Sequence, residues 1–162
     1  MKIKLFLAVL SAACMSIGIS TSAWAAPFTV SADFAEVTDT ATGLIWRRCA
    51  EGAAPDATGN CIGASSALTH EAALGVAKTA AASTGKAWRL PSVRELGSLL
   101  NTNTLPAIDT AAFPSAPAIS TWTSSPAATD STKAWAVDFY IAFIYNEPRT
   151  ATNRVRLVRT AP

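Results

Sequence analysis

The chain has few side chains that could act as nucleophiles, bases or metal ligands. It contains three cysteines and a single histidine, His70. No nucleophile motif surrounds His70, and its place at the start of an expected helix favours a solvent-facing or capping role. Glu95 and Asp109 could be juxtaposed as an acid–base pair, but each also has a structural interpretation, and no glycine-rich phosphate loop occurs. The sequence therefore predicts that the protein is not an enzyme and uses no cofactor.

Cys49 and Cys61 flank a segment rich in Gly, Ala, Asp and Asn, which is typical of a surface loop. In an exported chain, two such cysteines favour a disulfide that closes the loop. The alternative is a pair of zinc ligands, but zinc would need further ligands, and no second cysteine pair occurs. We predict a disulfide between Cys49 and Cys61 and no metal site.

Residues 1–25 have the organisation of a secretory signal peptide. Lys2 and Lys4 form a basic start, an apolar run follows over 5–19, and Ala23-Trp24-Ala25 supplies the small residues that signal peptidase recognises. A transmembrane helix is one alternative, but the run is short and ends in a cleavage pattern. A lipoprotein signal at Cys14 is another, which lacks the usual upstream leucine. We expect cleavage after residue 25, no membrane span thereafter, and a protein that is periplasmic, on the cell surface or secreted.

Removal of the signal peptide changes the charge balance. The chain has 13 Lys and Arg residues and 11 Asp and Glu residues. Lys2 and Lys4 leave with the signal and no acid does, so 11 basic residues then balance 11 acidic ones. A neutral chain has no general electrostatic attraction for nucleic acid, and we predict no nucleic-acid partner.

Two short helices are predicted in the middle of the chain. Thr69 can cap the first helix, which carries Glu71 in its first turn and ends at Gly85. Its apolar stripe is expected to consist of Ala73, Val76, Ala77 and Ala80. In the second helix, Ser92 and Glu95 fit a capping box, in which each side chain accepts a hydrogen bond from the other residue's backbone N–H. Its buried face is expected to consist of Leu96, Leu99 and Leu100.

Most other segments are typical of strands. A hairpin is expected from 34–37 and 44–46, and single strands from 121–125, 134–139, 141–145 and 155–159. Within 134–139 the large residues alternate with small ones, which predicts one buried face made of Trp135, Val137 and Phe139. Asp109 suits an Asx turn. The core is expected to be anchored by Trp46, Trp88, Trp122 and Trp135. Helices followed mostly by strands predict an α+β domain.

Six segments occur in a recognisable order. They are VTDTATGLIW (37–46), WRLPSVREL (88–96), PAIDTAAFP (106–114), TWTSSP (121–126), AWAVDF (134–139) and VRLVR (155–159). Together they resemble the DUF1566 family, also called the Lcl C-terminal domain. The spacing of Cys49, Gly52, Cys61 and Gly63 is similar to a family pattern as well. We place this domain at residues 34–160, after a short N-terminal segment at 26–33.

The resemblance implies a C-type-lectin-like fold, with two short helices packed on a small, twisted antiparallel sheet and many loops. It also implies an extracytoplasmic recognition module, and the collagen-like adhesin that gives the family its name binds sulfated glycosaminoglycans. Three features of the sequence depart from what this resemblance implies. The Glu-Pro-Asn-like triplet of calcium-dependent lectins is replaced here by Glu147-Pro148-Arg149, and arginine cannot ligate calcium. The collagen-like region is absent, and the neutral charge weakens the glycosaminoglycan analogy.

The candidate ligand site lies in the expected return hairpin and the loop after it. Aromatic rings there can stack on sugars or anchor a protein, and polar groups can fix orientation. The predicted ligand-binding residues are Tyr140, Phe143, Tyr145, Asn146, Glu147, Arg149, Asn153 and Arg154. The alternative is that half of the aromatic residues belong to the core. A local anion patch could be formed by Arg149, Arg154, Arg156 and Arg159, although Arg156 could instead pair with Asp138 across the sheet.

The sequence thus predicts an exported, adhesin-like binding module that recognises a carbohydrate, such as a sulfated glycan, or a surface protein. The alternative is a structural or assembly subunit of the cell envelope or of a surface appendage, with no small-molecule ligand. Such a subunit would expose an apolar surface to its partner. An oligomer is compatible with both hypotheses.

Overall fold

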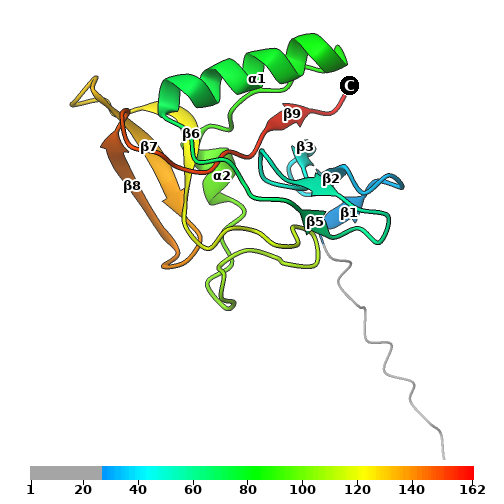
Figure 1. Cartoon of the computed structure of the whole chain (residues 1–162). Helices are drawn as coiled ribbons and strands as arrows, with labels where there is room; N and C mark the ends of the chain where they lie inside the picture. Colours follow the sequence, from blue (N-terminus) through cyan, green and yellow to red (C-terminus); the bar gives the residue numbers. More distant parts are fainter. Residues whose placement is uncertain (1–26) are drawn as a thin grey trace, which may run out of the picture.

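The computed structural model describes residues 27–162, so the expected signal peptide lies outside the described residues. Within them the chain forms two α-helices and three antiparallel sheets, which confirms the α+β class. The two larger sheets lie on opposite sides of the molecule, and the long helix α1 (His70–Thr84) runs across the top of both (Figure 1). Neither helix in this part of the chain is long and apolar enough to cross a membrane.

The first sheet has the strand order β1-β2-β3-β9. The expected hairpin is present as β2 (Glu36–Asp39) and β3 (Leu44–Arg47), which pair antiparallel. The sequence did not indicate β1 (Phe28–Val30), which pairs with β2. A small two-stranded sheet, β4 (Ala54–Pro55) and β5 (Cys61–Ile62), follows.

The strand expected over 155–159 is shorter and later, because only β9 (Val158–Thr160) joins the first sheet. The residues before it bond to several elements in turn. Arg154 exchanges backbone hydrogen bonds with Ser120 and Trp122, Val155 accepts from Glu51, and Leu157 accepts from Arg47. We call residues 153–158 the connecting segment, since it passes from one large sheet to the other.

The second large sheet consists of β6 (Ser120–Pro126), β7 (Lys133–Asp138) and β8 (Phe143–Pro148) in that order. The return strand starts later than expected because residues 139–142 form the turn. The prediction that β7 buries only its large side chains was wrong. Ala134 and Ala136 are fully buried beside Trp122, Val137 is buried on the other face, and Trp135 is only half-buried. Both faces of the sheet are covered at β7, so alternation along this strand could not reveal which face is buried.

Helix α1 has the expected limits, with Thr69 Oγ1 accepting from Ala72 N and Gly85 ending the helix in the left-handed conformation. Its alanines are buried as predicted, while Val76 is half-buried. The solvent-facing or capping role of His70 was wrong. Its side chain is 2% exposed, Nε2 lies 2.9 Å from the Thr123 carbonyl oxygen, and the ring packs edge-on against Trp122. Burial lowers the pKa of His70, so the ring joins α1 to β6 in its neutral form.

The predicted capping box begins α2 (Val93–Gly97). Glu95 N donates to Ser92 Oγ over 3.2 Å, and Ser92 N donates to Glu95 Oε2 over 2.7 Å. The structure adds Arg89, which donates two hydrogen bonds to the Glu95 carboxylate, of 2.8 and 2.7 Å. Leu96 and Leu99 are buried as expected, and Leu100 is half-buried.

Replacing Glu95 with glutamine should remove part of the acid sensitivity of folding. The hydrogen bonds from Arg89 are the main cause that lowers the pKa of Glu95 from 4.5 to about 2. A lowered pKa in the folded state gives stability that is present above the unfolded pKa and lost as the pH falls through the folded one. Glutamine keeps the capping box but loses the negative charge that pairs with Arg89. E95Q should therefore be about 0.5–1 kcal/mol less stable at neutral pH. Urea unfolding at several pH values should show this difference shrinking towards pH 2, and a constant difference would contradict the prediction.

Two clusters of buried side chains form the core. One joins the first sheet to α2 and β7 and contains Trp46, Leu96 and Phe113. The other lies under α1 and contains Trp88, Trp122 and the small residues of α1 and β7. Three of the four tryptophans expected in the core are therefore buried, and Trp135 is the exception.

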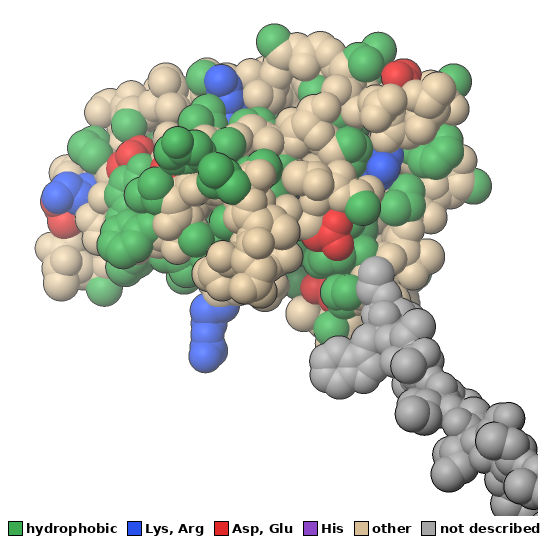
Figure 2. Space-filling model, turned by 90° about the horizontal axis from the view of Figure 1, so that it is seen from below, with side chains coloured by type: hydrophobic (Ala, Val, Ile, Leu, Met, Phe, Trp, Pro, Cys, Tyr) green, Lys and Arg blue, Asp and Glu red, His purple; other side chains and the backbone are tan. Residues whose placement is uncertain are grey.

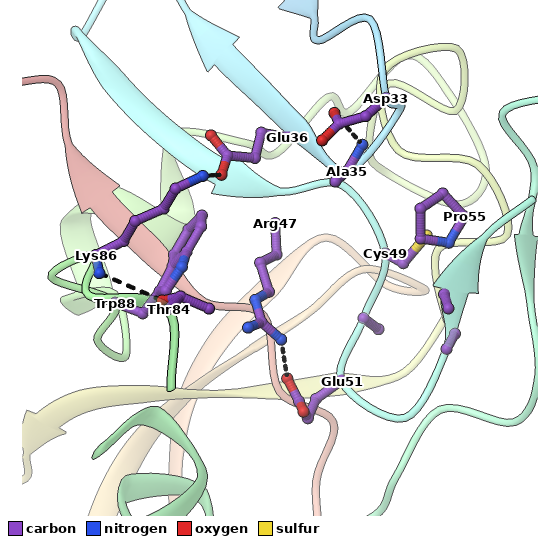
Figure 3. A pocket seen from close by; sticks show the side chains of 13 residues that line it. Asp33, Ala35, Glu36, Arg47, Cys49, Glu51, Pro55, Thr84, Lys86 and Trp88 are labelled. Atoms are coloured by element: carbon purple, nitrogen blue, oxygen red, sulfur yellow. Dashed lines mark hydrogen bonds and ion pairs between the residues drawn. The ribbon is translucent and has the colours of Figure 1, made fainter. Parts of the chain in front are cut away.

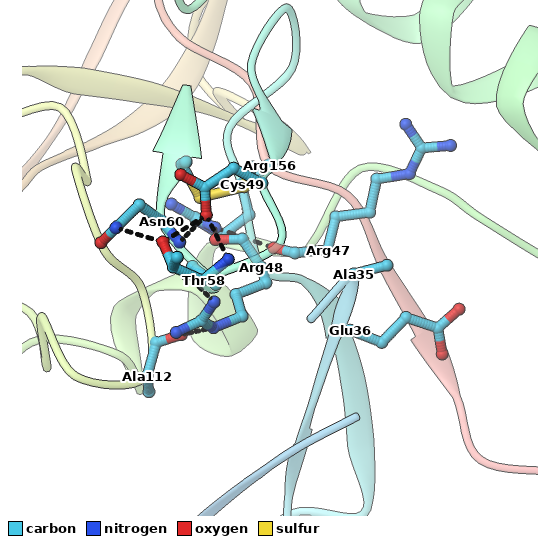
Figure 4. Close-up of a disulfide and its surroundings, with 12 residues drawn as sticks. Ala35, Glu36, Arg47, Arg48, Cys49, Thr58, Asn60, Ala112 and Arg156 are labelled. Atoms are coloured by element: carbon cyan, nitrogen blue, oxygen red, sulfur yellow. Dashed lines mark hydrogen bonds between the residues drawn. A yellow bond between two sulfur atoms is a disulfide. The ribbon is translucent and has the colours of Figure 1, made fainter. Parts of the chain in front are cut away.

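The predicted disulfide joins Cys49 to Cys61 and closes a loop on the first sheet (Figure 4). Asp56 Oδ1 folds the loop by accepting hydrogen bonds from Thr58 N and Asn60 N. Arg48 reaches across it, donating to the carbonyls of Gly59 and Ala112. The Asx turn expected at Asp109 is also present. Its Oδ1 accepts hydrogen bonds from the backbone N–H groups of Ala111 and Ala112.

Candidate functional site

The structure divides the predicted ligand-binding residues between the two faces of β8. Phe143, Tyr145 and Glu147 alternate with Ile144 and Asn146, so they lie on opposite faces. Ile144 lies towards α2, since its Cδ1 atom is next to Gly97. Tyr145 lies on the other face, where its hydroxyl contacts Ser120. Asn146 is thereby separated from the aromatic pair.

Phe143 and Tyr145 form a stacked aromatic pair on this face. Their ring centroids are 6.1 Å apart and the ring planes differ by 29°. Phe143 is 57% exposed, while Tyr145 is half-buried. Tyr140 in the preceding turn is also exposed. Tyr140 and Phe143 are thus accessible to a ligand, and Phe143 is not part of the core.

Polar side chains surround this pair. Ser120 Oγ donates to Asp138 Oδ2 over 3.2 Å and lies 2.5 Å from the Tyr145 hydroxyl. Because Ser120 has one hydroxyl hydrogen, the Tyr145 phenol supplies the hydrogen for that second contact. Burial and the nearby carboxylates of Glu147 and Asp138 raise the pKa of Tyr145, so the phenol stays protonated at neutral pH. We call Phe143 and Tyr145 together with Ser120, Asp138 and Glu147 the aromatic face.

Asn153 belongs to this surface as a support. It is buried, and its Nδ2 donates to Glu147 Oε2 over 2.7 Å. Its backbone is fixed in turn by reciprocal hydrogen bonds with Leu68. Asn153 therefore orients the Glu147 carboxylate and is not itself open to a ligand.

The four arginines do not form one anion patch. Arg156 is 3% exposed and donates to the backbone carbonyls of Arg47 and Arg48, so its expected pairing with Asp138 was also wrong. Arg159 pairs with Glu36 at 2.7 Å. Arg154 is half-buried on the connecting segment, and Arg149 follows β8 beside the start of α1.

A second candidate, which the sequence did not indicate, is a cleft of about 310 Å³ between β2, β3 and the end of α1 (Figure 3). We call it the charged cleft; its main side chains are Glu36, Arg47, Glu51, Lys86 and Trp88. Its charges neutralise one another. Lys86 Nζ lies 2.5 Å from Glu36 Oε1, and Arg47 Nη1 lies 3.2 Å from Glu51 Oε2.

The aromatic ring of the charged cleft is covered. Trp88 is 5% exposed, and the guanidinium carbons of Arg47 and Arg159 lie 5.4 and 5.3 Å from its ring centroid. These cations hold the tryptophan in cation–π contacts and close it to solvent. Residues far apart in sequence build the cleft, so no local pattern could have revealed it. Its groups are already partnered, and the aromatic face is the stronger candidate for a ligand.

A family model described as the Lcl C-terminal domain matches residues 35–159, which is most of the chain. The protein belongs to the Lcl C-terminal domain family. A search of curated proteins gives no match. The match to the Lcl C-terminal domain begins just before β2 and ends within β9, so it includes the aromatic face and the charged cleft.

No group of three or more His, Cys, Asp or Glu side chains in residues 27–162 of this Lcl C-terminal domain is placed to hold a metal ion. On the aromatic face, Glu147 is bound to the Asn153 amide. The face presents an open ring, a protonated phenol and two carboxylates, and Asp138 Oδ2 and Glu147 each keep acceptor positions beside their bonds to Ser120 and Asn153. Such groups can stack on a flat apolar surface and accept or donate hydrogen bonds beside it.

Proposed function

We propose that this Lcl C-terminal domain is a binding module that recognises carbohydrate through its aromatic face. The observation that carries the proposal is the exposed Phe143 ring, stacked beside Tyr145 and flanked by Asp138 and Glu147. A sugar presents C–H groups on one side, which pack against a ring, and hydroxyls at its edge, which bond to carboxylates. The two kinds of group lie next to each other on this surface.

We further propose a C-type-lectin-like fold and an extracytoplasmic location. Two helices beside small antiparallel sheets, many loops and a disulfide support these proposals. The separated arginines favour neutral sugars over densely sulfated glycans, because Arg156 and Arg159 are engaged inside the protein and the aromatic face carries the carboxylates of Asp138 and Glu147.

A second function, that of an assembly subunit, is favoured by one observation. Four large apolar side chains are exposed at the turn before β8 and at its start: Tyr140, Ile141, Phe143 and Ile144. Figure 2 shows hydrophobic side chains gathered on the lower face of the molecule, on the side where β8 lies. A patch of this kind is suited to a protein partner as well as to a sugar.

Binding of the purified protein to a broad glycan panel, with calcium and with chelator, tests the main proposal. We expect binding that chelator does not change. F143A should weaken it by about tenfold or more, since the open ring supplies the stacking surface. The matched control is I62A, because Ile62 is 56% exposed but lies on β5, and this variant should bind normally.

Either of two results would contradict carbohydrate recognition by this face. One is a panel with no bound glycan, which would favour the assembly subunit. The other is an equal loss of binding in F143A and I62A, which would place the sugar elsewhere.

A further inference from the structure

Within residues 27–162, no strand pairs with the outer edge of β8. In the sheet order β6-β7-β8, this strand pairs on one side with β7. Arg149 N donates to Thr132 O over 2.9 Å, so these two residues form a hydrogen-bonded pair. In an antiparallel ladder every second pair is hydrogen-bonded, and this pair therefore determines which residues of β8 bond to β7. The backbone groups of Phe143, Tyr145 and Glu147 therefore point to β7, and those of Ile144 and Asn146 point outward.

The usual protections of an exposed edge are missing from most of β8. Its pairing with β7 runs without a bulge over six residues, from Phe143 to Pro148. The strand carries no lysine, and its single charge is Glu147. Phe143 is 57% and Ile144 37% exposed at its start. A flat, nearly neutral and apolar edge of this kind is a template for another strand.

We propose that β8 pairs antiparallel with β8 of a second copy of this chain. The occupant follows from self-complementarity. Only registers that set outward-pointing residues opposite one another can form hydrogen bonds, and Pro148 has no N–H to offer. Pairing centred on Tyr145 sets Ile144 opposite Asn146 of the second copy, so every outward N–H and C=O of these two residues is used. Pairing centred on Asn146 would set Pro148 opposite Ile144 and lose a bond at each end.

The charges agree with the same register. With Tyr145 at the centre, each Glu147 lies opposite Phe143 of the second copy, so no like charges face each other. The two sheets become one continuous sheet, and both aromatic faces lie on the same side of it. The dimer does not rest on the proposed carbohydrate recognition, because it uses the edge of the strand and leaves the face open.

Sedimentation velocity across micromolar to millimolar concentrations tests the dimer with a matched pair of variants. The backbone N–H of Asn146 faces solvent in the monomer. In the proposed dimer it donates a hydrogen bond to the second copy. N146P removes it and N146A keeps it, while both remove the side chain. We expect the unaltered protein and N146A to dimerise and N146P to stay monomeric. Thermal unfolding of the two variants at a concentration where both are monomeric should show that N146P still folds, since proline is tolerated on a free edge.

A cysteine variant tests the register without relying on the proline. In Y145C the two new thiols would face each other across the dimer axis, in a non-hydrogen-bonded pair whose Cα atoms are about 4.5 Å apart. Oxidation should therefore link the two copies, whereas E147C should remain unlinked. A monomer at every concentration, equal dimerisation of N146P and N146A, or linkage of E147C in place of Y145C would each overturn the proposal. Glycan binding by a protein that stays monomeric would overturn the dimer alone.

Discussion

Replacing Arg156 with alanine should lower the free energy of unfolding by about 3 kcal/mol, because a buried charge is holding two backbone carbonyls. Nη1 of Arg156 donates to Arg47 O over 2.8 Å and to Arg48 O over 2.5 Å. The guanidinium also lies 4.7 Å from the ring centroid of Phe113. Burial lowers the pKa of Arg156 to about 10, so the side chain is still charged at neutral pH. Alanine would leave both carbonyls without a donor and a cavity over the ring.

Denaturant unfolding measures this effect, with R94A as the control. Arg94 is exposed on α2, and its side chain makes no hydrogen bond or ion pair within the described chain. R94A should change stability by no more than about 0.5 kcal/mol. R156M separates packing from hydrogen bonding, since methionine keeps the apolar stem. If R156M were as stable as the unaltered protein, the hydrogen bonds to Arg47 and Arg48 would not matter for stability.

Removing the disulfide by the double substitution C49S/C61S should cost about 3 kcal/mol. The bond closes a loop with a sequence separation of 12 residues, and its loss would enlarge the set of conformations open to the unfolded chain. Loss of the disulfide should also weaken contacts within the folded state. Gly59 in this loop accepts a hydrogen bond from Arg48 and lies against the Phe34 ring, so both contacts depend on the position of the loop.

Guanidinium unfolding with and without reductant measures this second effect. Reductant should lower the midpoint of the unaltered protein to that of C49S/C61S, and it should leave the double variant unchanged. An unchanged midpoint after complete reduction would mean that Arg48 and the Asp56 turn hold the loop without the disulfide.

The sequence correctly predicted the helix caps and turns, because these features depend on residues that are close together in the chain. The cap at Ser92, the end of α1 at Gly85 and the turn at Asp109 each depend on residues within a few positions, and the structure has all three. The disulfide was predictable because the two cysteines flank one loop.

Features that depend on distant contacts could not be predicted from the sequence. His70 is buried because Trp122 and Thr123 of β6 pack against the start of α1. The small side chains of β7 are buried because α1 covers that face of the sheet. The expected return strand did contain Phe143 and Tyr145, but the arginines are separated by the path of the connecting segment, which no local pattern describes.

The connecting segment has a consequence for the order in which this protein can fold during synthesis. Asn153 bonds to Leu68, Arg154 to Trp122, and Val158 to Arg89 and to β3. The segments around Leu68 and Arg89, and strand β3, are made early in translation. They therefore lack their hydrogen-bond partners in the connecting segment until residue 158 has left the ribosome. A chain without these residues lacks the hydrogen bonds through which the connecting segment links the two large sheets. Completion of the core is thereby a late event in the synthesis of this protein.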